Sequence, residues 1–290
     1  GGLGVTSADA SDTPYLFYSR RIGLNNARVV PIDAGGRITG KVGPWAIGLM
    51  NIQAGDERVS GTDATNFSVF RLKRDVLSRS AIGVMGTNRS VSATGTGSNQ
   101  AYGVDGSFGL TRDITVGTYW ARTNSTDVSG NDQSWQGRCD YNADRYGARA
   151  EVLEVGANFR PDVGFLRRTD FRRSYGEVRF SPRPARLKAV RKFTLSSGAE
   201  YIENGAGDVD TRVLRGLFTT EFHTSDQVSV DAVRIYDFLP VAFTPAGSPA
   251  PIAVGGYTFS DVGASYTFGA QRRVSGVVAV RGGEYYDGTI

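Results

Sequence analysis

The sequence predicts an all-β protein, an antiparallel transmembrane up-and-down β-barrel, and three observations predict it. Apolar and polar residues alternate along most of the chain, and the alternating segments are about as long as tilted membrane-spanning strands. Short and long connections also alternate between them. No run approaches the ~18 apolar residues of a spanning helix, and the mean hydropathy of -0.26 suits strands that turn only one face to lipid.

The stretch "AYGVDGSFGLTRDITVGTYWA" shows the alternation most clearly. Tyr102, Val104 and Phe108 fall on one face of a strand, and Gly103 and Asp105 fall on the other, because successive side chains point to opposite faces. After a Thr-Arg-Asp turn the pattern resumes in the partner strand. The stretch is therefore predicted to form a hairpin with one apolar face and one polar or small face.

About fourteen such segments follow one another, and no helical period interrupts them. They are residues 37–42, 45–53, 65–74, 79–87, 101–110, 114–122, 133–143, 146–159, 171–182, 190–203, 211–224, 227–238, 255–269 and 273–285. Short links at 43–44 or 111–113 alternate with long ones rich in Gly, Ser, Asn and Thr, such as 88–100, as expected for the two rims of a barrel. A soluble all-β sandwich or propeller is the alternative, but its strands are usually half as long.

Charge favours a polar lumen over a nucleic-acid surface. The chain carries 33 Lys and Arg against 29 Asp and Glu, interspersed along the sequence, and nearly all the cations are arginine. The single Cys139 cannot form an internal disulfide and is expected to be buried or to face the lumen. His223 is the only histidine, which excludes a His-rich metal site, and alternation places it on the lumen side beside Glu221.

Residues 1–34 are predicted to lead into or plug the barrel, which occupies residues 35–290. Arg20 and Arg21 lie among aromatic side chains in the segment 15–32, which is expected to fold back into the lumen. A plain linker between domains is the alternative. The carboxylates proposed as partners for the two arginines are Asp105, Glu177, Glu200 and Glu221.

The arginine-rich stretch at 160–173, "RPDVGFLRRTDFRR", has two interpretations. It is either a turn whose arginines pair with Asp162 and Asp170, or a basic rim that faces anionic lipid or an acidic ligand. No nucleophile motif such as G-x-S-x-G accompanies His223, so no catalytic residue is predicted, and no cofactor.

Five motifs resemble the barrel region of a family of Gram-negative outer-membrane proteins, the domain of unknown function 5916. They are "LFYSRRIG", "GRITGKVGPWAIGLMN", "NFSVFRLKRD", "ANFRPDVGFLRR" and "GEYYDG", which occur in that order over nearly the whole chain. In that family the barrel follows a periplasmic module similar to family 9 carbohydrate-binding domains. The resemblance implies an outer-membrane location and a chain that is a fragment of a larger barrel. It implies no established activity.

The expected function is transport or docking, at the outer membrane, of a substrate bound by the missing periplasmic module, with carbohydrate as one candidate. The expected partners are the lipid bilayer and lipopolysaccharide, and not nucleic acid. The alternatives are a barrel-based outer-membrane hydrolase, a closed structural barrel, and a soluble all-β binding domain.

Overall fold

The computed structural model describes residues 12–25, 28–244, 251–286 and 288–289. These residues fall into two compact units, and each is described by itself. Unit 1 comprises Gly1–Arg138 and Leu153–Arg172, and unit 2 comprises Cys139–Val152 and Arg173–Ile290.

Strands make up most of both units, and the 3-10 turn η1 (Ser19–Arg21) is the one helical element with described bounds. Two short strands of the N-terminal segment, β1 (Leu24–Asn25) and β2 (Arg28–Val29), pair only with each other. The remaining strands are β3 (Ile32–Val42), β4 (Trp45–Ala54), β5 (Thr65–Leu77), β6 (Ser80–Arg89), β7 (Asn99–Gly109), β8 (Ile114–Ser125), β9 (Gln133–Asn142), β10 (Tyr146–Val155), β11 (Phe171–Phe180), β12 (Val190–Asn204), β13 (Val209–Phe222), β14 (Gln227–Leu239), β15 (Gly255–Thr267), β16 (Val277–Tyr285) and β17 (Gly288–Thr289).

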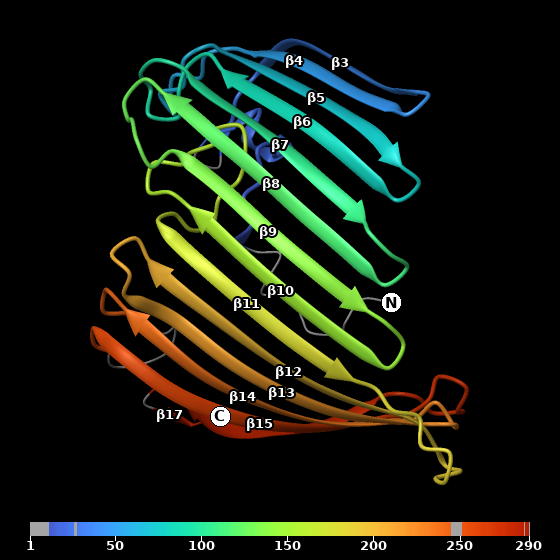
Figure 1. Cartoon of the computed structure of the whole chain (residues 1–290). Coiled ribbons are helices and arrows are strands. Elements are labelled where there is room, and N and C mark those ends of the chain that lie inside the picture. Colours follow the sequence, from blue (N-terminus) through green and yellow to red (C-terminus); the bar gives the residue numbers. More distant parts are fainter. Residues whose placement is uncertain (1–11, 26–27, 245–250, 287, 290) are drawn as a thin grey trace. The chain divides into compact units, whose positions relative to one another are not determined.

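The long strands form one antiparallel sheet in which neighbours follow the order of the chain, from β3 to β17. Figure 1 shows β3 to β8 of unit 1 side by side as arrows, in blue to green. The prediction of an all-β chain with about fourteen strands is confirmed, because the fifteenth strand, β17, has only 2 residues. Among the described residues β3 and β17 stand at the two ends of the order and do not pair, so the sheet is open.

The predicted strand positions agree with the structure to within a few residues, with three larger differences, one of which is that β16 begins at Val277, four residues after the predicted start. β3 begins at Ile32, five residues before the predicted start and inside the segment assigned to the plug. Alternation is weak there, because "DAGG" offers only small or charged side chains to the pairing with β4. β10 ends at Val155 although residues to 159 continue the apolar pattern, because a turn follows at once and Phe159 is buried within it.

The strand register of unit 1 lines up large apolar side chains on one surface, called its apolar face. One row crosses five strands through the pairs Ile47 with Leu72, Leu72 with Val84, Val84 with Val104, and Val104 with Trp120. All but Leu72 are among the large hydrophobic side chains exposed on the protein surface. The apolar side predicted for the hairpin at 101–121 is thus part of this apolar face, since Val104 and Trp120 both lie in the row.

Unit 2 has a corresponding apolar face. Its clearest row runs from Leu195 through Phe218 and Val230, which are paired in register and exposed. The residues between them, such as Asp231 and Glu221, point to the opposite surface, called the ionic face.

Short and long connections alternate in length, largely as predicted. The links at 43–44, 78–79 and 143–145 are short, whereas residues 55–64 and 156–170 form long loops. Three connections depart from the pattern, because 181–189 and 268–276 are long among the short ones and 205–208 is short among the long ones.

One pair of turns is cross-linked by a carboxylate. Asp226, in the turn after β13, accepts hydrogen bonds from Arg272 Nε at 2.8 Å, the Gly269 N–H at 2.8 Å and Thr224 Oγ1 at 2.9 Å. The Arg272 guanidinium, followed by the Gly269 amide, holds the pKa of Asp226 far below its usual range. The ionised carboxylate therefore ties the β13–β14 turn to the β15–β16 connection.

We expect the Asp226→Asn variant to be less stable than the wild type at neutral pH, with a smaller deficit at about pH 2. Because the folded pKa is lowered, the stabilisation is fully present above the unfolded pKa of ~3.9 and is lost as the pH falls through the folded pKa. Urea unfolding at both pH values measures this difference. Asp113→Asn, in a turn where the structure describes no ion pair for Asp113, serves as control. An Asp226→Asn deficit that is equal at both pH values would contradict the prediction.

Candidate functional site

The N-terminal segment of unit 1, described at residues 12–25 and 28–31, folds back onto the sheet. Ile22 and Val30 are buried in an apolar cluster with Phe67 and Val69 of β5 and with Val163 of the 156–170 loop. Figure 1 shows this segment, in dark blue, behind the strands of unit 1. The face that it covers is the one opposite the apolar face, because Phe67 and Val69 alternate with the exposed Phe70. Ile22 and Val30 are therefore packed against the sheet, which favours a folded-back segment over a plain linker.

Backbone contacts fix the position of the segment. Tyr15 forms an isolated antiparallel bridge with Phe165, and the Tyr18 N–H donates to the Val163 carbonyl at 2.9 Å. A Cβ on Gly164 would overlap the carbonyl oxygen of Tyr15, so only glycine permits this approach. The Gly164-Phe165 pair thus forms the docking point of the segment.

The same loop is held by a polar network around Asp162, which is buried. Its carboxylate accepts from Ser92 Oγ at 2.9 Å and from the Ala93 N–H at 2.7 Å, and it pairs with Arg160 Nε at 3.3 Å. Arg160 also donates to Asp127 at 2.7 Å. That hydrogen bond lowers the pKa of Asp127 and raises the pKa of Arg160. The three loops at 90–98, 126–132 and 156–170 are therefore tied together beside the segment.

Of the two interpretations of residues 160–173, the internally paired turn holds for the first aspartate. Arg160 pairs with Asp162 as predicted, but Asp170 has no described ion pair and instead takes a positive φ of 57° before β11. Arg173 belongs to β11 rather than to a loop. Its partner lies in another strand, as described below.

The surface of unit 1 opposite its apolar face is called its ionic face. There, an ion pair joins two strands that are separated by a third. Arg71 of β5 donates to both oxygens of Asp105 on β7, the longer bond being 2.9 Å. The strand between them, β6, contributes Gly83, whose Cβ would lie 2.6 Å from Arg71 Nη2. The glycine leaves the room in which the guanidinium lies.

Unit 2 repeats this arrangement with β15 in the middle. Asp231, Gly263 and Arg281 are register partners in three adjacent strands, and Arg281 Nη2 donates to Asp231 at 2.6 Å. A Cβ on Gly263 would lie 2.6 Å from Asp231 Oδ1. Arg281 also pairs with Asp261. Two different parts of the sheet therefore use the same solution, an aspartate and an arginine paired over a glycine.

The most deeply buried charges of unit 2 are those of Arg173 on β11 and Glu151 on β10. Their side chains are 0% and 2% exposed, and Arg173 Nη2 donates to Glu151 Oε1. Glu200 of β12 lies 3.8 Å from the other guanidinium nitrogen. Two carboxylates thus converge on one arginine, a geometry that suits the planar guanidinium with its several N–H donors.

The structure shows partners within the same unit for most of the predicted site residues. Arg20 and Arg21 are exposed, and Arg21 donates from Nε to the Gly164 carbonyl at 3.1 Å rather than to a carboxylate. Within their own units, Asp105 pairs with Arg71, and Glu200 with Arg173. The apolar neighbours of the arginines, not their charges, anchor the segment.

The other predicted site residues are Glu177, Glu221 and His223. Glu177 accepts from Tyr175, and Glu221 pairs with Arg191 at 2.7 Å. His223 was expected in a strand beside Glu221, but β13 ends at Phe222 and His223 is exposed in the turn that follows. The strand predicted from alternation extended beyond Phe222, whereas in the structure a turn that contains Ser225, with its positive φ, ends the strand there.

The expectation that Cys139 is buried is wrong, because Cys139 is exposed. It lies on β9 two residues before Tyr141, so the two side chains share a face. Sequence reasoning missed the pair formed by Arg173 and Glu151. Alternation places Arg173 on the same face of β11 as Glu177, but it does not show that Glu151 of β10 lies beside it.

Two negative findings apply to the described residues. They contain no group of three or more His, Cys, Asp or Glu side chains that could hold a metal ion. They also contain no helix long and apolar enough to cross a membrane.

No model of a known protein family matches the chain, and no curated protein is similar to it. The resemblance to the domain of unknown function 5916 therefore stays a prediction.

Proposed function

We propose that the chain forms part of a β-barrel that spans the bacterial outer membrane, with its apolar faces toward lipid and its ionic faces toward a lumen. The observation that carries this proposal is the two-sided sheet in both units. Rows of exposed Leu, Val, Phe and Trp cover one surface, while paired arginines and carboxylates occupy the other. Water would disfavour so extensive an apolar surface, whereas hydrocarbon would accept it.

The free edges of β3 and β17 place a condition on this proposal. In hydrocarbon each unpaired backbone group costs several kcal/mol, so both edges need strand partners in the membrane. Further strands of the intact protein would meet that condition, in line with the resemblance described above.

Within this barrel the N-terminal segment is proposed to act as a plug. It covers the surface opposite the apolar face and is anchored to a loop cluster that the Asp162 network holds in place. Such an arrangement supports transport or docking of a substrate, with carbohydrate as a candidate by resemblance alone. Lipid and lipopolysaccharide would surround the outer surface.

Three alternatives remain to be tested against this proposal. Conductance of the full-length protein in a planar bilayer separates a passage from a closed structural barrel. Hydrolysis of acyl or glycosyl substrates would favour a barrel-based hydrolase. A chain that folds as a monomer without detergent would favour a soluble all-β binding domain.

We expect Val104→Arg and Val262→Arg each to destabilise the chain by about 2–4 kcal/mol in lipid vesicles, because arginine near the middle of the bilayer costs that much on the lipid face. Both valines are already half exposed, at 50% and 55%, so a soluble protein would lose almost nothing. Val59→Arg, in the 55–64 loop and 69% exposed, is the matched control. Urea unfolding in vesicles gives the three values. Equal, small effects at all three positions would contradict the membrane proposal.

A further inference from the structure

Unit 2 carries an excess of cations where the β9–β10 turn and the β11–β12 connection lie. Arg145, Arg183, Arg186 and Lys188 are exposed there, and they are called the basic rim. Asp144 neutralises Arg183 through two hydrogen bonds, one of them 2.7 Å long. Among the described residues the other three cations have no ion pair. The rim therefore presents uncompensated positive charge.

Arg145 connects this charge to the apolar face of unit 2. Its guanidinium carbon lies 5.9 Å from the ring centre of Tyr146 and 5.5 Å from that of Phe180. The two rings are stacked with their centres 5.3 Å apart. Aromatic rings beside cations are typical of the level at which lipid headgroups meet hydrocarbon. Leu187, between Arg186 and Lys188 in the sequence, adds an exposed apolar side chain to the β11–β12 connection.

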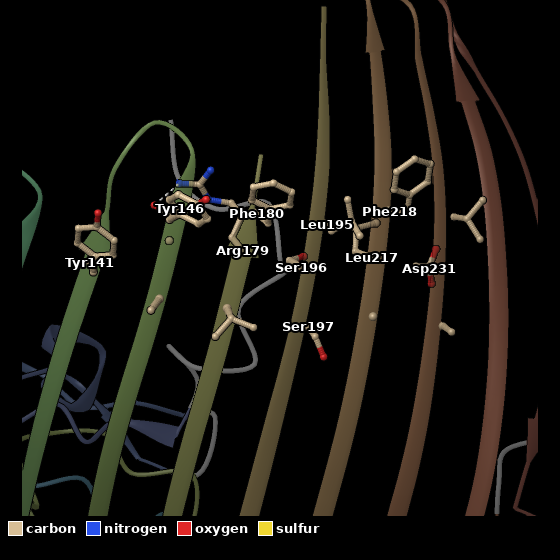
Figure 2. Close-up of a pocket in the computed structure, with 16 residues that line it drawn as sticks. Tyr141, Tyr146, Arg179, Phe180, Leu195, Ser196, Ser197, Leu217, Phe218 and Asp231 are labelled. Atoms are coloured by element: carbon tan, nitrogen blue, oxygen red, sulfur yellow. Dashed lines mark hydrogen bonds between the residues drawn. The ribbon is translucent and has the colours of Figure 1, made fainter. Parts of the chain in front are cut away.

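A groove of about 710 Å³ begins at this aromatic pair and continues along the apolar face. Figure 2 shows Tyr146 and Phe180 at one side and Leu195 and Phe218 farther along. The hollow follows from register, because a row of small residues lies directly beside a row of large ones. The small row is Ser197, Gly216 and Ala232, and the large row is Leu195, Phe218 and Val230.

We propose that this surface binds an anionic membrane lipid, with its phosphate at the basic rim and one acyl chain in the groove. The proposal rests on the membrane-spanning function given above and names a partner for one part of that surface. Charge complementarity identifies the occupant. The rim is positive and the adjoining groove is apolar, and an anionic lipid has a negative headgroup for the first and an apolar chain for the second. A free phosphate would leave the groove empty, and an uncharged lipid would leave the rim cations without an anion.

The first test removes the charge. The chain, refolded in detergent micelles, is titrated with short-chain phosphatidylglycerol or phosphatidylcholine and bound lipid is counted by native mass spectrometry. We expect the wild type to prefer phosphatidylglycerol, and the triple variant R145Q/R186Q/K188Q to bind it at least about tenfold more weakly, since each cation near a lipid surface contributes about a factor of five.

The matched control is R20Q/R28Q/R58Q, which removes three other exposed cations for which the structure describes no ion pair. It should keep the wild-type preference for phosphatidylglycerol. Equal loss in both triple variants would mean that general charge, not the rim, governs binding, and would overturn the proposal. So would a rim variant that retains its preference.

A second variant tests the groove. A Cβ on Gly216 meets nothing within 4 Å, so Gly216→Leu adds a side chain to the groove without disturbing the strands. We expect this variant to bind phosphatidylglycerol several-fold more weakly, while its far-UV circular dichroism is unchanged. Inorganic phosphate is offered separately, and if it displaces the lipid at comparable concentration the site is a phosphate site and the lipid proposal fails.

Failure of this inference can be told from failure of the proposed function. Protection of the strands from added protease in vesicles reports insertion independently of lipid preference. An inserted chain without lipid preference would overturn only the lipid site. A chain that stays unprotected would overturn the membrane proposal on which the site rests.

Discussion

Replacing Arg173 by alanine is expected to destabilise the chain by about 3–5 kcal/mol, the largest effect of any single substitution considered for unit 2. The reason is the loss of the shared partner of Glu151 and Glu200, which leaves two carboxylates buried without their cation. The guanidinium itself is fully buried, so its removal also leaves a cavity. Urea unfolding of the refolded chain, followed by circular dichroism, measures the change.

Arg183→Ala provides the control, because Arg183 also pairs with a carboxylate, that of Asp144, but in full contact with solvent. Exposed pairs of this kind contribute about 0–1 kcal/mol. A loss below about 1 kcal/mol in both variants would show that the buried pair does not hold the β10–β12 region. A double variant that replaces Arg173 by Met and Glu151 by Leu should recover part of the loss, because the uncompensated charge of Glu151 is then removed as well.

The strands could be predicted from sequence because each one alternates over its own length. Ten residues of period two are a local pattern, so the ends of β4, β8 and β12 fall within a few residues of their predicted positions. The predicted strand ends are wrong where apolar and polar residues no longer alternate clearly. β3 starts among small residues, and β13 stops at a turn just before His223.

The ion pairs could not be predicted, because they depend on register between strands. Asp105 finds Arg71 only because β5, β6 and β7 align so that Gly83 lies between them. Sequence alone shows that an aspartate and an arginine share a face, but not which strands are neighbours or how far each is shifted. Asp105 was therefore correctly assigned to the polar face, and its partner within unit 1 is Arg71 rather than Arg20 or Arg21.

The N-terminal segment illustrates the same limit at a smaller scale. That it folds back could be inferred from its density of aromatic and apolar residues. The residues that hold it could not be inferred from the sequence. Ile22 and Val30 are separated by the β1–β2 hairpin and come together only through contacts with β5 and the 156–170 loop. A charged pair of residues is conspicuous in a sequence, whereas two isolated aliphatic residues are not.

Removing these two aliphatic anchors, in Ile22→Ala/Val30→Ala, is expected to detach the segment from the sheet. Truncating a buried Ile alone typically costs 2–5 kcal/mol, which is comparable to the free energy that holds a segment of this size. Hydrogen exchange should report it as a loss of protection at the Tyr18 and Val30 amides, which donate to Val163 and Gly23. If the segment plugs a lumen, the single-channel conductance of the full-length protein should rise as well.

Three comparisons make this last prediction specific. Val29→Ala is the matched control, since Val29 is 76% exposed beside Val30 at 4%, and it should change neither exchange nor conductance. Arg20→Ala should also have little effect, because Arg20 is exposed and the structure describes no ion pair for it. Gly164→Val should release the segment by a separate route, because the added side chain would displace Tyr15 while the cluster around Ile22 stays intact. Full exchange protection in both releasing variants would show that other contacts hold the segment, whereas lost protection with unchanged conductance would show that the segment is docked but does not obstruct a passage.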